Sequence, residues 1–240
     1  MKKMVCAAAL ATCGAAMAIT DAEIEKLIGE MTLEEKVGQL VQLGSAGKEG
    51  GPLSQDATGV ALPADVAEMV RKGEVGSLIG ACGVTNFNAF QRIAMNEARV
   101  KIPLMVGHDM IHGVMTQAPI PLALSCAWDE KTWQDCGRLI AVESPAKGCN
   151  WTFTPMVDMC RDPRWGRIAE GPGQDPYLGG RMGAAMVKGI QSKAGVMPVA
   201  ACLKHFAAYG GAEAGRDYNT VEMSESTFRN VYLPPFKAGV

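Results

Sequence analysis

Four short apolar runs constrain the fold of this chain more than any other feature. They span residues 75–79, 103–107, 151–157 and 199–203, and segments with helical patterns lie between them. Continuous apolar strands that alternate with helices are typical of a parallel sheet covered on both faces. The sequence therefore predicts an α/β fold.

Polar residues cluster where three of these predicted strands end. His108 and Asp109 follow the second strand, Asp158 follows the third, and Lys204 and His205 follow the fourth. Barrels of the (β/α)8 type place their active sites at the carboxyl ends of the strands. A doubly wound sheet is the alternative, but no Gly-x-Gly-x-x-Gly follows the first strand. We therefore predict a TIM-like barrel with a site at these strand ends.

The helices are predicted from caps and from apolar residues at helical spacing. Asp21 is predicted to cap the first helix, and Thr32 and Glu35 form a capping box for a second helix through Val41. Residues 44–59, rich in glycine and serine, are predicted to form a loop. Further helices are predicted at residues 64–72, 86–100, 133–142, 177–191 and from 224 onward, the last with an interruption at 234–235.

Four predicted strands make only half of an eight-stranded barrel. An open barrel exposes unpaired strand edges, which native proteins normally avoid. The expectation is that residues 19–240 form the N-terminal portion of a (β/α)8 barrel domain that is incomplete and apparently truncated. The oligomeric state is left open.

The first 18 residues have the pattern of a signal peptide. Lys2 and Lys3 supply the positive start, residues 5–11 a short apolar segment, and residues 16–18 (AMA) a cleavage site. We therefore expect export to the periplasm or the extracellular space. One alternative is a buried N-terminal helix, for which the segment is short and rich in alanine. Another is a lipoprotein anchor at Cys13, for which the preceding residue is unfavourable.

Composition excludes several classes of partner. The 240 residues include 23 basic and 25 acidic ones, a formal charge of −2, which is not the basic footprint of a nucleic-acid-binding protein. After the first twenty residues, no apolar run is long enough to cross a bilayer.

The cysteines form no C-x-x-C pair, which argues against a zinc framework. A disulfide among Cys126, Cys136 and Cys149 is left open.

A dense group of charges follows the third predicted strand. Residues 158–170 contain three arginines, two aspartates, a tryptophan and a glutamate. So many charges near a core are costly unless a ligand or opposite charges satisfy them. Together with Asp109, Lys204 and His205, this group is predicted to form one rim of a sugar-binding site.

Several long motifs occur along the chain in a fixed order. They are residues 31–40 (MTLEEKVGQL), 107–113 (GHDMIHG), 119–123 (PIPLA), 158–167 (DMCRDPRWGR), 170–178 (EGPGQDPYL), 204–209 (KHFAAY) and 215–219 (GRDYN). In these motifs the chain resembles glycoside hydrolase family 3, specifically its secreted bacterial β-glucosidase-like branch. Three residues, Ala118, Pro172 and Gln174, depart from the residues common in the family, which affects the expected loop geometry.

The resemblance implies that four residues bind substrate. Asp109 would accept hydrogen bonds from two hydroxyls of the non-reducing-end sugar. Arg167 and Lys204 would donate to neighbouring hydroxyls, and His205 would complete the same wall. The alternative for Asp109 is that it caps the turn after the strand.

Three further residues are secondary candidates for the rim of the site: Glu170, Trp165 and Arg216. For Glu170 and Arg216 the alternative is solvated loop charge, and for Trp165 it is packing beneath the loop. The remaining charges of the dense group, Arg161, Asp162 and Arg164, are expected to form an internal ion-pair network that holds the loop.

A metal site is the competing interpretation of one motif. His108 and His112 flank an acidic residue and imitate the zinc motif His-Glu-x-x-His. That motif requires a helix, which brings both rings to one face, whereas here a strand precedes the segment and glycines flank it. We therefore expect no metal and no cofactor.

The resemblance implies a retaining, exo-acting β-glycosidase, foremost a β-glucosidase, acting on a β-linked oligosaccharide or glycoside. Such enzymes use one carboxylate as nucleophile and a second as acid/base. It also implies that the nucleophile is an aspartate beyond Val240 and that a second domain supplies the acid/base. No catalytic residue is therefore predicted within this chain, and the fragment alone is expected to be inactive. The alternative is an inactive half-barrel, or a sugar-binding remnant without catalytic activity.

Overall fold

The computed structural model describes residues 19–44, 64–80 and 83–240. The predicted signal peptide, including Cys13, and all but the first residue of the predicted loop at 44–59 lie outside the described residues. Within the described residues the fold is built on one parallel sheet.

Four short strands form this sheet in the order β1-β2-β3-β4. They are β1 (Gln42–Gly44), β2 (Ser77–Ile79), β3 (Met105–His108) and β4 (Trp151–Thr152). All three neighbouring pairs are parallel. Leu78 of β2 pairs with Val106 of β3, and both are fully buried. The predicted parallel sheet is confirmed.

Two predicted strands were wrong in extent, and one strand was missed. The run at 199–203 forms no strand; it is tied to its neighbour by isolated parallel bridges, Trp151 to Ala200 and Met156 to Lys204. The run at 151–157 forms a regular strand only at β4. Pro155 has no N–H to donate, so a continuous ladder cannot pass through it. Strand β1 begins directly after the predicted helix, which was expected to run through Val41, and its last residue, Gly44, was predicted as the start of a loop.

The helices occupy most of the predicted segments. They are α1 (Asp21–Glu30), α2 (Leu33–Gly38), α3 (Ala64–Lys72), α4 (Val84–Arg92), α5 (Pro121–Ser125), α6 (Glu130–Ala146), α7 (Pro176–Ile190), α8 (Glu225–Thr227) and α9 (Pro234–Gly239). Helix α5 was not predicted. The predicted interruption near 234–235 is present one residue earlier, at Leu233, and Pro234 begins α9, because proline fits the first turn, where an N–H has no helical partner.

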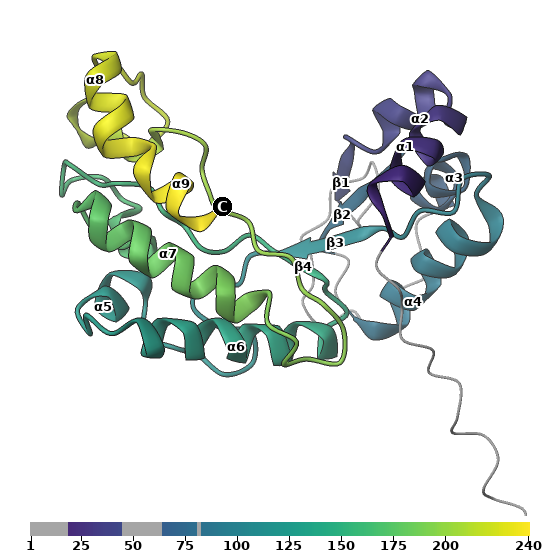
Figure 1. Cartoon of the computed structure of the whole chain (residues 1–240), viewed down its shortest axis with the longest axis horizontal. Helices are drawn as coiled ribbons and strands as arrows, with labels where there is room; N and C mark the ends of the chain where they lie inside the picture. The colour runs from purple at the N-terminus through teal and green to yellow at the C-terminus, as the bar shows by residue number, and fades with distance from the viewer. Residues whose placement is uncertain (1–18, 45–63, 81–82) are drawn as a thin grey trace, which may run out of the picture.

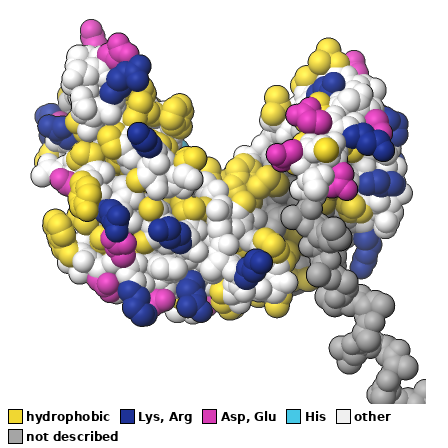
Figure 2. All heavy atoms as spheres, in the orientation of Figure 1, with side chains coloured by type: hydrophobic (Ala, Val, Ile, Leu, Met, Phe, Trp, Pro, Cys, Tyr) yellow, Lys and Arg dark blue, Asp and Glu magenta, His cyan; other side chains and the backbone are white. Residues whose placement is uncertain are grey.

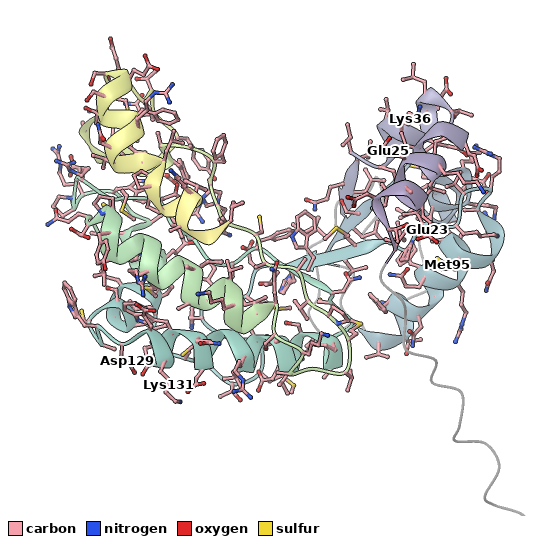
Figure 3. The ribbon with its side chains drawn as sticks, in the orientation of Figure 1. Glu23, Glu25, Lys36, Met95, Asp129 and Lys131 are labelled. Carbon is pink, nitrogen blue, oxygen red and sulfur yellow. The ribbon has the colours of Figure 1, made fainter. Side chains whose placement is uncertain are left out.

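Side-chain caps fix where several helices begin. Thr20, not the predicted Asp21, is the N-cap of α1, and it forms a capping box with Glu23. The predicted box of Thr32 and Glu35 is confirmed at α2. At α6 the carboxylate of Asp129, labelled in Figure 3, accepts from the backbone N–H groups of the second and third helical residues at 3.1 Å each.

The helices lie in two groups on either side of the sheet. Figure 1 shows α1–α4 at one end of the molecule and α5–α9 at the other, with the strands between them. Figure 2 shows that the surface is hollowed between the two groups and that hydrophobic side chains are exposed along the hollow. Among the described helices, none combines the length and the apolar character needed to cross a membrane.

Each group of helices has its own hydrophobic core. Val66 and Val70 of α3 and Phe90 of α4 pack against Leu78 and Val106 of the sheet. The second core lies between α6 and α7, where Trp133 and Ile140 pack near Met186. Cys126 and Cys136 are free thiols, so no disulfide joins any two of Cys126, Cys136 and Cys149.

Helices α6 and α7 approach so closely that only glycine fits at their contact. A Cβ atom at Gly137 of α6 would lie 2.6 Å from the carbonyl oxygen of Met186 on α7. Real Cβ atoms do not approach backbone oxygens so closely, so any larger residue would force the helices apart. In contrast, a Cβ at Gly29 of α1 would meet nothing within 4 Å.

We expect Gly137→Ala to destabilise the protein by about 1–3 kcal/mol through overpacking, despite the higher helix propensity of alanine. Gly29→Ala is the matched control, and we expect it to be neutral or stabilising by up to about 1 kcal/mol. Thermal unfolding of both variants measures the two effects. Equal melting temperatures for both variants would contradict the close helix contact.

Candidate functional site

Two predicted site residues form an ion pair at the strand ends. Asp109 follows β3, and Lys204 ends the bridged run beside the third predicted strand. The Nζ atom of Lys204 donates to Oδ1 of Asp109. The lysine side chain is only 10% exposed, whereas that of Asp109 is 51% exposed. A buried ammonium requires such a partner, and the exposed carboxylate remains accessible to a ligand.

The neighbouring His205 is held by a buried aspartate. The backbone N–H of His205 donates to Oδ2 of Asp158 at 2.9 Å, and its ring Nδ1 lies 2.8 Å from the same oxygen. The Asp158 side chain is fully buried, while that of His205 is 35% exposed. The bridge between Met156 and Lys204 brings the two residues together.

Arg167 and Glu170 form a second ion pair, close to the wall formed by Asp109, Lys204 and His205. The guanidinium donates from Nε and Nη2 to the two carboxylate oxygens at 2.7 and 2.6 Å, a bidentate geometry that strengthens the pair. Arg167 holds the pKa of Glu170 below its usual value, and the charges of Lys204 and His205 act in the same direction. Glu170 therefore lies within electrostatic reach of the wall.

An aromatic cluster supports Arg167 from beneath. The Trp165 ring is buried, packs edge-on against Tyr209 at 5.2 Å, and donates from Nε1 to Asp217 at 2.9 Å. The Tyr209 ring lies 5.3 Å from the Arg167 guanidinium carbon and 5.0 Å from the His205 ring. Burial is the main cause that raises the pKa of Tyr209 to about 12. Because the Trp165 ring is buried and bonded to Asp217, it packs beneath the charged segment 158–170.

The remaining charges of the loop are arranged differently. Arg164 donates to Asp162 through its backbone N–H and its side chain, and this holds the pKa of Asp162 at about 2. Of the predicted internal network of Arg161, Asp162 and Arg164, only the Asp162–Arg164 ion pair is present among the described residues, and its arginine is exposed. Arg161 and Arg216 are exposed, and among the described residues the Arg216 side chain makes no hydrogen bond or ion pair with this cluster.

A cavity of about 300 Å³ lies beside Asp109. It is lined by residues 108–114, Gln117 and Lys147, so Asp109 is the one predicted site residue that reaches it. Strand β3 ends at His108, and the following residues form a turn, not the helix that the zinc motif needs. Within the described part of the chain, no three histidine, cysteine or acidic side chains are grouped to hold a metal.

Two residues of this site, Asp158 and Tyr209, were not predicted from the sequence. Asp158 appeared only as a strand end, and Tyr209 only as part of a motif, because neither spacing nor composition reveals which side chains meet across distant segments. The apolar runs that precede Asp109, Lys204 and His205 were the signal that located the other residues.

Comparison with known proteins shows that the chain is similar in sequence to glycosidases. Residues 32–240 match the model of the glycosyl hydrolase family 3 N terminal domain. The chain is 40% identical over 222 residues to a periplasmic beta-glucosidase of Salmonella typhimurium, which covers 92% of this chain and 28% of that protein. It is also 33% identical over 156 residues to a beta-xylosidase of Formosa agariphila, covering 59% of this chain and 22% of that protein.

Solved structures show the same fold. A beta-glucosidase from Listeria innocua in complex with isofagomine has a TM-score of 0.77 and 39% identity, covering 92% of this chain and 30% of that chain. A mutant of it in complex with laminaribiose has the same TM-score and 37% identity, with 92% and 31% covered. The described sheet and helices are thus the N-terminal part of a TIM-like barrel. The chain spans about three tenths of the length of these relatives.

The Arg167–Glu170 pair leads to a test of stability against pH. The lowered pKa of Glu170 means that the ionised pair stabilises the fold above pH 4.5, its ordinary pKa, and that this stabilisation is lost as pH falls through the folded-state value. We expect Glu170→Gln to lower the free energy of unfolding by roughly 1 kcal/mol at neutral pH, and the difference from wild type to shrink towards zero below pH 4.5. Denaturant unfolding at several pH values measures this.

The matched control is Glu225→Gln, which removes an exposed partner of Arg229 on the surface. That variant should differ little from wild type at any pH, because exposed ion pairs contribute little. A Glu170→Gln difference that does not change with pH would show that the ion pair does not carry the stabilisation.

Proposed function

The chain belongs to glycoside hydrolase family 3, and on that premise we propose that it carries the substrate-binding wall of a β-glucosidase-like, exo-acting, retaining glycosidase. The observation that carries this proposal is the exposed carboxylate of Asp109, held by the buried ammonium of Lys204 with His205 next in the chain. Donors and acceptors alternate there, as a sugar ring with adjacent hydroxyls requires.

In this proposal each residue of the wall has a defined part. Asp109 accepts from two hydroxyls of the non-reducing-end sugar, and Lys204 both orients that carboxylate and donates to a hydroxyl. His205 meets the same sugar through its exposed ring edge. Arg167 donates to a further hydroxyl while Glu170 and Tyr209 hold its guanidinium in place.

Three other side chains, Glu170, Trp165 and Arg216, are proposed to support the substrate-binding residues or to line the rim of the site. Glu170 and Trp165 act through Arg167 and the loop that carries it, and Arg216 is an exposed candidate for the rim. We propose no catalytic nucleophile or acid/base within these residues. In a retaining enzyme both are carboxylates on opposite sides of the glycosidic bond, and we place them in the part of the relatives that the match does not cover.

The proposed substrate is a β-linked glycoside or oligosaccharide. The beta-glucosidase names of the relatives, and the laminaribiose in the complex with the Listeria protein, support glucose as the sugar bound by Asp109. We further propose that residues 1–18 are a signal peptide and that the barrel domain begins at residue 19. Export to the periplasm agrees with the location in the name of the Salmonella relative.

Hydrolysis of an aryl β-glucoside by the full-length gene product tests the proposal. We expect turnover, and we expect Asp109→Asn to lower kcat/KM by about ten- to a hundredfold, because a charge-assisted hydrogen bond is worth about 1.5–3 kcal/mol. Asp135→Asn is the matched control, since Asp135 pairs with Lys131 on the outer side of α6, where Figure 3 labels the lysine. Its kinetics should equal those of wild type.

Absence of turnover with aryl β-glucosides, or an Asp109→Asn variant as active as the Asp135→Asn control, would contradict the proposal. The first result would favour a sugar-binding protein without catalytic activity. The second would place the substrate elsewhere on the molecule.

A further inference from the structure

One buried charge has no part in the proposed function. The Asp158 carboxylate is fully buried, and both groups that it binds, the backbone N–H and ring Nδ1, belong to His205. Both bonds fall on Oδ2; among the described residues, Oδ1 accepts no hydrogen bond. Burying a carboxylate with so few hydrogen-bond donors costs free energy. The contact with His205 is therefore the feature that a role for Asp158 has to explain.

We propose that Asp158 is a positioning residue, which fixes the tautomer and orientation of the His205 ring so that Nε2 meets the substrate. This inference rests on the proposed function for its consequence in catalysis. The contact itself, and its effect on the ring, are independent of that function.

The tautomer follows from the chemistry of the two partners. An ionised carboxylate only accepts hydrogen bonds, so at 2.8 Å the Nδ1 atom of His205 must carry the proton. In the neutral ring Nε2 then has the free lone pair and accepts a hydrogen bond, for example from a sugar hydroxyl. The ring is 35% exposed, so a ligand can reach it. Without Asp158 this hydrogen bond is lost, and it no longer favours the proton on Nδ1 over the proton on Nε2.

The orientation follows from two restraints on the same ring. One carboxylate oxygen binds both the main chain and the side chain of His205, which limits rotation about the side-chain bonds. The ring of Tyr209 lies 5.0 Å away at an interplanar angle of 76°, which limits the ring on a second side. A group held in this way loses less conformational entropy when a ligand binds.

The backbone of the two segments does not need this carboxylate to stay together. Val157 donates to the carbonyl of Lys204 at 2.9 Å, and Lys204 donates to the carbonyl of Pro155 at 3.2 Å. These bonds already fix the register, so a purely structural role would leave the contact with Nδ1 unexplained.

Two variants separate orientation from charge. Asp158→Ala removes both accepting oxygens. Asp158→Asn removes the charge but keeps one oxygen that can accept both bonds, with the amide nitrogen in the place of the unbonded Oδ1. Glu143→Ala is the matched control, because Glu143 is also buried but accepts from Met115 and Thr116, away from the histidine.

The direct test is NMR of the full-length gene product labelled with 15N-histidine, at a pH where the rings are neutral. The His205 signals are identified by their loss in His205→Gln. We expect His205 protonated on Nδ1 in the wild type and in Asp158→Asn, and a mixture of tautomers in Asp158→Ala. Glu143→Ala should lower the melting temperature and leave the tautomer unchanged. A wild-type ring protonated on Nε2, or an unchanged tautomer in Asp158→Ala, would overturn the proposal.

A kinetic cycle with an aryl β-glucoside tests the consequence. If Asp158 acts through His205, Asp158→Ala should lower kcat/KM about as much as His205→Ala does, on the order of tenfold or more. The double variant should then be no worse than His205→Ala alone, and Asp158→Asn should recover most of the activity. Multiplying effects in the double variant would show that Asp158 acts independently of His205. A wild type without turnover would refute the proposed function, while the NMR result would still decide the role of Asp158.

Discussion

Parallel pairing between the segments around residues 151–156 and 200–204 fixes the geometry on which the site depends. The bridges from Trp151 to Ala200 and from Met156 to Lys204 set the register, and β3 pairs with β4 on the other side. Because the carboxyl ends of parallel strands meet at one edge, this register carries Asp109, Asp158 and Lys204 to the same place. A shift of the 200–204 segment by one residue would turn the Lys204 side chain to the opposite face.

The charges of the wall are paired within the protein. The buried Lys204 is matched by Asp109, Arg167 by Glu170, and the His205 ring by Asp158. Asp109 and His205 are the exposed members of their pairs, whereas Arg167 and Glu170 are both half-buried. Groups held in place before the ligand arrives bind it with a smaller loss of conformational entropy. Several fixed donors and acceptors suit a sugar, because each can bind a different hydroxyl.

Sequence patterns predicted the parallel sheet, most helices and the strand ends that carry polar residues, because apolar runs and caps are local signals. They missed β1, since three residues ending in glycine carry too little pattern, and they overestimated 199–203, which is apolar but only bridged. The contacts of Asp158 with His205 and of Trp165 with Asp217 join residues about 50 positions apart. Only the register and the loop conformation determine such pairs, so no local pattern could reveal them.

We infer that the ends of these paired segments form one sugar-binding wall. A crystal structure of the full-length gene product with bound glucose tests it most directly. We expect sugar hydroxyls at hydrogen-bond distance, about 3 Å, from the Asp109 carboxylate, the Lys204 ammonium and Nε2 of His205, with Arg167 beside them. Glucose bound away from Asp109 and Lys204, or absent from this wall at saturating concentration, would contradict it.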